Sequence, residues 1–228
     1  MRSSQLIMAS DGECLLPFIL PQSSLLSGCT QSGKTFWIKK VLLNADKMFT
    51  PVPKKVIIAY TAWQPDYEAL EAHWGENIEF MTNIPSKDYL LEVSSPPDHT
   101  ILVIDDKMSQ LGTRDVLDTV CVLCHHRLIS TFILTQNLYH SGTYIRDISL
   151  NVQNIILFRN PRSLRQISTL AGQMMPGKAE FLLDAYSRAV AKDHGYLFID
   201  LNMKSPSPKF QFRTGIFPGE QTIVYLPK

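Results

Sequence analysis

The most informative stretch of the chain is a glycine-rich segment that ends in lysine and threonine. Its residues fit the pattern G-x-x-x-x-G-K-[ST] at every position, as Gly28-Cys29-Thr30-Gln31-Ser32-Gly33-Lys34-Thr35. The glycines let backbone N–H groups approach phosphate oxygens, and the start of a following helix adds a favourable dipole. We expect Lys34 to reach the β- and γ-phosphates of ATP and Thr35 to bind Mg²⁺. An apolar run before this segment and a helical pattern after it, 24–27 and 36–43, supply the strand–loop–helix setting that the motif requires.

A second apolar run ends in two carboxylates, at Asp105 and Asp106. A buried strand that ends in a carboxylate is the Walker B pattern, so Asp105 is predicted to hold the magnesium through water. A second acid at the tip of the strand can polarise the attacking water as a general base, and we assign this role to Asp106. The alternative for Asp106 is a surface acid in a loop.

A third strand-like run, Phe132–Thr135, ends in two amides. Such a residue can hydrogen-bond the γ-phosphate or the attacking water. Gln136 is the first candidate for this sensor role and Asn137 is the second. The alternative is an amide that caps the following turn.

Hydrolysis of a phosphate also needs a cation for the charge of the transition state, and a neighbouring subunit can supply it. Arg146 is the first candidate, Arg127 the second and Arg159 the third. Each of them could instead be a structural or surface arginine.

These motifs need a scaffold in which short β-branched runs alternate with longer helical patterns, which predicts a parallel sheet with helices on both faces. The expected strands are Ser23–Ser27, Lys55–Tyr60, Asn77–Met81, Thr100–Asp105, Ser130–Thr135, Asn154–Phe158 and Tyr196–Asp200. The expected helices are Lys34–Met48, Pro65–Glu71, Arg114–His126, Pro161–Ala171 and Pro176–Ala191. Pro161 and Pro176 are placed in first helical turns, and Gly172 is expected to cap a helix end.

The predicted fold class is therefore α/β, a P-loop NTPase three-layer sandwich with a mostly parallel central sheet. The strand expected at Lys55–Tyr60 lies in the sequence between the glycine-rich segment, which is the Walker A motif, and the Walker B motif. Its position favours the additional-strand division of these ATPases. The tail is expected to form a terminal β-hairpin from Phe210–Thr214 and Thr222–Tyr225. We expect one domain over 1–228, with the core over about 20–200 and the hairpin over about 208–228. The lack of an Asn-Lys-x-Asp motif argues against a GTPase.

Composition sets broader limits on the class of protein. Of the 228 residues, 45% are hydrophobic and 19% are charged, which is typical of a globular domain. No apolar run approaches the roughly 20 residues of a membrane helix, and the start of the chain lacks the pattern of a signal peptide. These features predict an intracellular protein that is not secreted. Cys121 and Cys124 match the spacing C-x-x-C-H with His125, but a helix with small residues toward the core explains them better than haem or zinc.

Taken together, the chain resembles the genome-packaging ATPases of large double-stranded DNA viruses, in the broad FtsK–HerA superfamily. It looks closest to those of polintons and adintoviruses, with relatives in poxviruses and membrane-containing phages. The resemblance covers roughly residues 20–200. It rests on these stretches in this order: Ser27–Thr35, Tyr60–Tyr67, Val103–Asp106, His125–Arg127, Leu134–Leu138, Arg146–Asn151 and Phe158–Arg162.

The resemblance implies an ATP- and Mg²⁺-dependent motor that moves double-stranded DNA into a preformed capsid. It implies a homo-oligomeric ring of five or six subunits and recruitment by capsid vertex proteins, in an infected cell (nucleus or cytoplasm) or at the virion vertex. Two alternatives stay open at this point. One is another DNA translocase or helicase-like ATPase, and the other is a nucleotide-dependent capsid assembly switch with little turnover.

Overall fold

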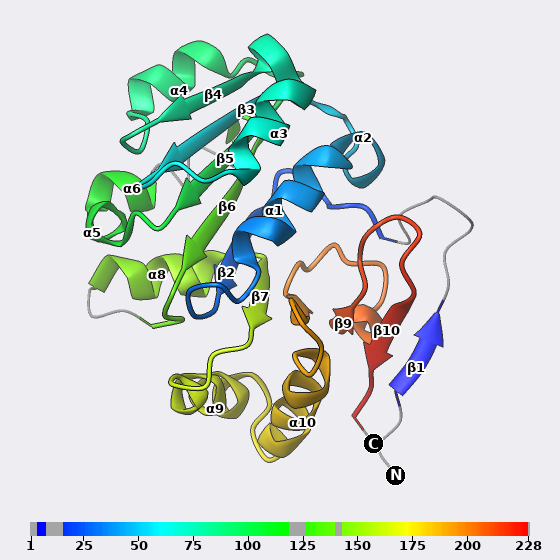
Figure 1. The fold of residues 1–228 in the computed structure, drawn as a ribbon. Helices are drawn as coiled ribbons and strands as arrows, with labels where there is room; N and C mark the ends of the chain where they lie inside the picture. The colour runs from blue at the N-terminus through cyan, green and yellow to red at the C-terminus, as the bar shows by residue number, and fades with distance from the viewer. Residues whose placement is uncertain (1–3, 8–15, 119–125, 140–142, 228) are drawn as a thin grey trace.

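The strands of the chain join into one mixed sheet. The computed structural model describes residues 4–7, 16–118, 126–139 and 143–227, and within these residues the sheet has ten strands in the order β1-β10-β9-β8-β7-β2-β6-β5-β3-β4. The strands are β1 Ser4–Ile7, β2 Ser23–Ser27, β3 Pro53–Tyr60, β4 Ile78–Met81, β5 His99–Asp105, β6 Ile129–Thr135, β7 Asn154–Phe158, β8 Tyr196–Asp200, β9 Phe212–Thr214 and β10 Thr222–Tyr225. Figure 1 shows how they lie between helical layers.

The central part of the sheet is parallel and holds the motifs. β2 pairs with β6 on one side and β7 on the other, and β6 pairs in turn with β5, all in parallel. The strand of the third motif, β6, therefore lies between the two Walker strands, β2 and β5. This order confirms the additional-strand arrangement, although the intervening strand is β6, and the strand expected at Lys55–Tyr60 lies beyond β5. The order also brings the carboxyl ends of all three motif strands to one edge of the sheet.

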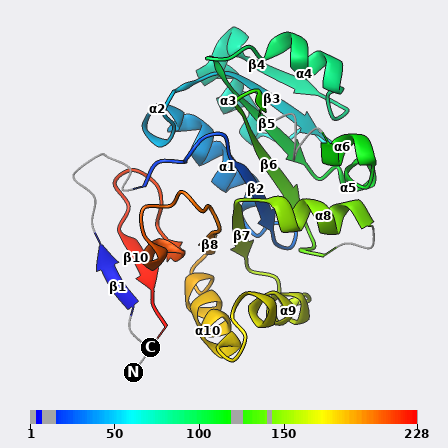
Figure 2. The same cartoon turned by 180° about the vertical axis from the view of Figure 1, so that it is seen from behind.

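The antiparallel end of the sheet contains the predicted hairpin. β8, β9, β10 and β1 follow β7 in antiparallel pairs. The first hairpin strand begins at Phe212 rather than Phe210, because the short 3-10 helix η3 (Pro208–Phe210) precedes it. The sequence did not indicate β1. It pairs with β10 along its whole length, so the first and last strands of the chain lie side by side in Figures 1 and 2.

Two hydrophobic cores fill the space between the sheet and its helical layers. Side chains alternate between the two faces along each strand, so Leu25 and Leu102 join one core while Leu26 and Val103 join the other. One face is covered by α1 Lys34–Leu43, α2 Ala45–Met48 and α3 Asp66–Trp74. The other face is covered by α4 Lys87–Val93, α5 Met108–Leu111, α6 Arg114–Asp118, α8 Thr143–Asn151, α9 Leu164–Met174 and α10 Ala179–Ala189. In Figures 1 and 2 the two layers are seen from opposite sides.

Several expected helix boundaries were wrong. The helix expected over Lys34–Met48 is divided at Asn44, whose side chain donates to the carbonyl oxygen of Lys40 and whose backbone leaves the helical region. α10 begins only after Gly177, because the positive φ of 76° at Gly177 cannot belong to a helix.

Pro161, Pro176 and Gly172 also differ from their expected positions relative to the helices. Ser163, and not Pro161, directly precedes α9, because residues 160–163 form a hydrogen-bonded turn first. Pro176 likewise lies before α10, and Gly172 lies inside α9 rather than capping its end, since the helix continues to Met174. The helix expected over Arg114–His126 begins as α6, and Cys121 and Cys124 lie outside the described residues. No helix in the described ranges is long and apolar enough to cross a membrane.

The buried His99 at the start of β5 gives the fold a predicted pH dependence. Its Nδ1 lies 3.2 Å from the carbonyl oxygen of Pro51, which can only accept, so Nδ1 carries the proton and Nε2 accepts from the Ser130 hydroxyl at 2.8 Å. Burial lowers the pKa of His99 to about 4, against the ordinary value of 6.5. The unfolded chain therefore binds the proton first as the pH falls, and the free energy of unfolding should drop by roughly 3 kcal/mol between about pH 6.5 and pH 4.

Urea unfolding at a series of pH values measures this effect. The variant His99→Gln should lose that part of the pH dependence, whereas His73→Asn, at an exposed position, should retain it. If His99→Gln kept the full slope of the wild-type protein, the buried neutral histidine would not be its source.

Candidate functional site

The glycine-rich loop lies in a crowded place between β2 and α1. The backbone N–H of Gly28 donates to the carbonyl oxygen of Thr135 at the end of β6. A Cβ atom at position 28 would lie 2.6 Å from both Cβ of Phe158 and Oγ of Ser32, so only glycine fits. Gly33 has a φ of 101°, and a Cβ there would lie 2.6 Å from Nδ1 of His194. Both motif glycines are therefore required by the geometry of this loop.

Lys34 folds back over the loop that precedes it. Its Nζ donates to the carbonyl oxygens of Gly28 at 2.7 Å and Cys29 at 2.9 Å. Burial lowers the pKa of Lys34 below its ordinary value, while the charges of Asp105 and Asp106 oppose this shift. A buried ammonium group held at the mouth of a loop of backbone amides is suited to an anion such as a phosphate chain.

Asp105 lies buried at the end of β5 and is held by two donors. The hydroxyl of Tyr67 donates to its Oδ2 at 2.6 Å, and Nε2 of Gln64 donates to the same oxygen at 3.1 Å. Burial raises the pKa of Asp105, the hydrogen bond from Tyr67 opposes this, and the neighbouring charge of Asp106 adds to the rise. Both donors follow β3, so the segment after this strand sets the position of the Walker B carboxylate.

Asp106 is exposed and turned toward the next strand. Its φ of 53° lies in the left-handed region, which is uncommon for a residue other than glycine. The Thr61 hydroxyl donates to the backbone carbonyl oxygen of Asp106 at 2.8 Å. The backbone N–H of Asp106 donates to the carbonyl oxygen of Leu134 in β6. Nε2 of Gln136 donates to its carboxylate, at 3.2 Å to Oδ2 and 3.5 Å to Oδ1. The two residues that the sequence proposes as base and sensor thus contact each other.

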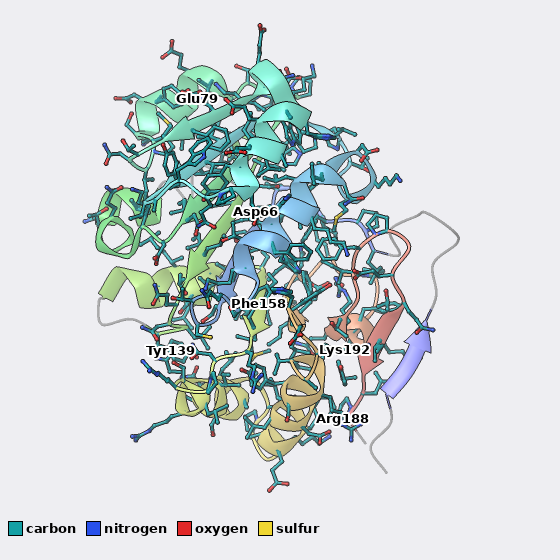
Figure 3. The ribbon with its side chains drawn as sticks, in the orientation of Figure 1. Asp66, Glu79, Tyr139, Phe158, Arg188 and Lys192 are labelled. Carbon is teal, nitrogen blue, oxygen red and sulfur yellow. The ribbon has the colours of Figure 1, made fainter. Side chains whose placement is uncertain are left out.

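These residues line a single cleft of about 460 Å³ at the carboxyl edge of the sheet. Its walls are formed by Thr30, Gln31, Gly33, Lys34, Thr35, Phe36, Gln64, Asp66, Asp105, Asp106, Gln136 and His194. Lys39 on α1 binds Asp66 on α3 at 2.7 Å and joins two of its walls. In the view of Figure 3, Asp66 and Phe158 are labelled on either side of the start of α1.

Asn137, Arg127 and Arg159 are not among the described residues that line this cleft. The side chain of Asn137 accepts from the Ser163 hydroxyl at 3.4 Å, away from Asp106. Arg127 precedes β6 and so lies toward the opposite edge of the sheet, while Arg159 is exposed and borders a separate hollow beside α9 and α10. Arg146 belongs to the first turn of α8, and its side chain lies outside what the structure describes.

The sequence motifs indicated no individual role for Phe36, Gln64, Asp66, Tyr67 and His194. Gln64 and Tyr67 hold Asp105, and Phe36 and His194 form one end of the cleft. Asn160 was also missed as a support. It is buried, and its Nδ2 donates to the carbonyl oxygen of Gln136 at 2.9 Å. Gln64 and Tyr67 lie in the stretch Tyr60–Tyr67, which contributes to the family resemblance, but that stretch indicated no role for either residue, and His194 had no signal.

The residues present fit a nucleotide with a magnesium ion. No group of three or more His, Cys, Asp or Glu side chains in the described part of the chain could hold a metal alone. Magnesium bound to a nucleotide needs only one or two protein oxygens, because phosphates and water supply the rest. Thr35 and Asp105 line the same cleft and could supply them.

Solved structures with the same fold include a viral NTPase. The genome packaging NTPase B204 from Sulfolobus turreted icosahedral virus 2, in complex with sulfate, is 14% identical with a TM-score of 0.55, covering 91% of this chain and 97% of that chain. The complex with AMPPCP is 16% identical with a TM-score of 0.54, covering 91% and 98%. The complex with AMP is 17% identical with a TM-score of 0.52, covering 79% and 93%. A scan of protein-family models and a search of curated proteins found no match.

The crowding at Gly28 predicts a loss of stability when a side chain is added. Gly28→Ala should lower the free energy of unfolding by about 1–3 kcal/mol, because the loop must move away from Phe158. Gly172→Ala is a matched control, since a Cβ meets nothing within 4 Å there and alanine favours a helix. Thermal unfolding of both variants measures the effect, and a Gly28→Ala protein as stable as the Gly172→Ala control would contradict it.

Proposed function

We propose that this protein is an ATPase that drives double-stranded DNA into a viral capsid. The observation that supports hydrolysis most directly is the exposed Asp106–Gln136 pair beside the phosphate loop. A role in DNA packaging is supported by the fold, which is shared with a genome packaging NTPase. The protein would act as a ring of five or six copies, recruited by capsid vertex proteins inside an infected cell or at the virion vertex.

In this proposal the loop and Lys34 bind the phosphate chain of ATP. The ammonium group exchanges its two loop carbonyls for phosphate oxygens, which carry the opposite charge. Thr35 and Asp105 hold Mg²⁺, which when bound would neutralise charge on the phosphates. Tyr67 and Gln64 keep the Asp105 carboxylate in place, since both donate to the same oxygen.

Asp106 acts as the general base. It accepts a proton from the attacking water, while Nε2 of Gln136 fixes the orientation of its carboxylate. Asn160 supports this pair by holding the backbone of Gln136. The exposed position of Asp106 allows water to reach it.

Two other functions share the same chemistry. Another DNA translocase or a helicase-like ATPase would hydrolyse ATP in the same cleft but would move DNA in a process other than packaging. A capsid assembly switch would bind ATP and turn over little, and the presence of both Asp106 and Gln136 in the cleft favours a true ATPase over it.

Steady-state ATP hydrolysis, with and without linear duplex DNA at two salt concentrations, tests the proposal. A motor that binds DNA phosphates should be stimulated by DNA. The stimulation should fade at high salt, because the free energy gained by releasing counterions from DNA falls as the salt concentration rises. Hydrolysis that does not respond to DNA at either salt concentration would leave an ATPase and favour an assembly switch, or a motor that engages DNA only at the capsid vertex.

Two cleft variants should separate binding from hydrolysis. Lys34→Ala should weaken ATP binding about tenfold or more, because the phosphates lose a charged partner. Asp106→Asn should bind ATP with near wild-type affinity but lower the turnover number by about 10²–10⁴, because the amide cannot accept the proton. Calorimetric titration measures the ATP affinity of each variant, and a phosphate-release assay measures its turnover. Near wild-type turnover by Asp106→Asn would show that another group is the base.

We further propose that Arg146 reaches the cleft of a neighbouring subunit. Arg146→Ala should then bind ATP but hydrolyse it slowly. Mixing it with Lys34→Ala subunits should restore part of the activity, since an intact arginine from one subunit can serve an intact cleft in the next. A mixture no more active than its separate components would exclude action in trans.

A further inference from the structure

Two aromatic side chains line the cleft, and the proposed mechanism of hydrolysis assigns no role to them. Phe36 lies in the first turn of α1, and His194 lies in the segment between α10 and β8. Their ring centroids are 5.2 Å apart, and their planes are inclined by 30°. Both line the same cleft as Lys34 and Thr35.

Phe36 is not part of the hydrophobic core. The buried residues of α1 are Trp37, Ile38, Val41 and Leu42, which face the sheet, whereas Phe36 is 49% exposed. A half-exposed aromatic ring that lines a polar cleft can contact a ligand through its apolar surface.

His194 lies against the phosphate loop and has an unusual backbone conformation. Its φ of 55° lies in the left-handed region, and the absence of a Cβ at Gly33 leaves room for the imidazole against the loop. Gly195 completes the turn, since a Cβ there would lie 2.5 Å from the carbonyl oxygen of Ala189. The imidazole therefore lies directly beside the loop.

The aromatic pair and the carboxylates lie on opposite sides of the loop. β6 and β5, which carry Gln136, Asp106 and Asp105 at their ends, follow β2 on one side. β7 and β8 follow on the other side, and because β8 is antiparallel to β7, its start lies at the same edge, where Tyr196 pairs with Phe158. His194 directly precedes that start. A phosphate chain lying in the loop thus has catalytic groups on one side and aromatic rings on the other.

We propose that Phe36 and His194 form the subsite for the base of the nucleotide. This inference rests on the proposed function, because it takes the loop as the site of the triphosphate. With the terminal phosphate on the side of Asp106, the nucleoside falls on the side of the two rings. A base would pack its π face against them, and such stacking adds affinity with little dependence on the identity of the base.

Binding of ATP and of inorganic tripolyphosphate, each with Mg²⁺, tests the proposal by calorimetric titration. Tripolyphosphate has the same phosphate chain and no base. Phe36→Leu should weaken ATP binding about tenfold and leave tripolyphosphate binding unchanged, while Phe36→Tyr retains the ring and both affinities. His194→Asn should also weaken ATP selectively, since asparagine tolerates the left-handed backbone and only the ring is removed. Leu164→Ala, at a 54% exposed position on α9 outside the cleft, is the control.

Each outcome has a distinct meaning. Selective loss of ATP affinity in both ring variants supports the base subsite. Wild-type ATP affinity in Phe36→Leu and His194→Asn overturns it, and so does an equal loss of ATP and tripolyphosphate, which would mean a distorted loop. If the wild-type protein bound neither ligand, the proposed ATPase function itself would fail, and the subsite with it.

Discussion

The close contact between the phosphate loop and the end of β7 is the constraint on which the rest of the site depends. Gly28 lies so near Phe158 that no side chain can be added, and its N–H is bound to β6. The thiol of Cys29 also donates to the carbonyl oxygen of Arg159, just beyond β7. The loop is therefore fixed to two strands at once, and Lys34 and the start of α1 take their positions from it.

The parallel order of the central strands turns this local contact into a site. Because β2, β6 and β5 end at one edge, the loop, Gln136 and the two aspartates meet there although they are far apart in the sequence. The antiparallel strand β8 starts at the same edge and brings His194 against the other side of the loop. One edge of the sheet thus carries both the charged and the aromatic halves of the cleft.

The sequence predicted those parts of the site whose signal is local. The loop, Asp105 and Asp106 could be recognised because each motif directly follows its own apolar strand, and the strands themselves were placed to within a few residues. Gln136 was expected to contact the γ-phosphate or the attacking water, and its hydrogen bond to Asp106 was not predicted.

Features that depend on distant contacts could not be read in this way. Tyr67 contacts Asp105 and His194 lies against Gly33, and neither contact could be predicted from the local sequence. The pairing of β1 with β10 joins opposite ends of the chain, and the division of α1 from α2 depends on the single side chain of Asn44. A role for Arg146 involves a second subunit, so it stays a prediction.

The central claim is that ATP hydrolysis in this cleft moves the protein along duplex DNA. The most direct measurement is displacement of a third strand from a triplex placed at one end of a linear duplex. The account predicts release of the third strand with ATP and Mg²⁺ and no release by the Asp106→Asn protein. If the wild-type protein hydrolysed ATP on the same DNA while the triplex stayed intact, the cleft would be an ATPase but the protein would not be a DNA motor.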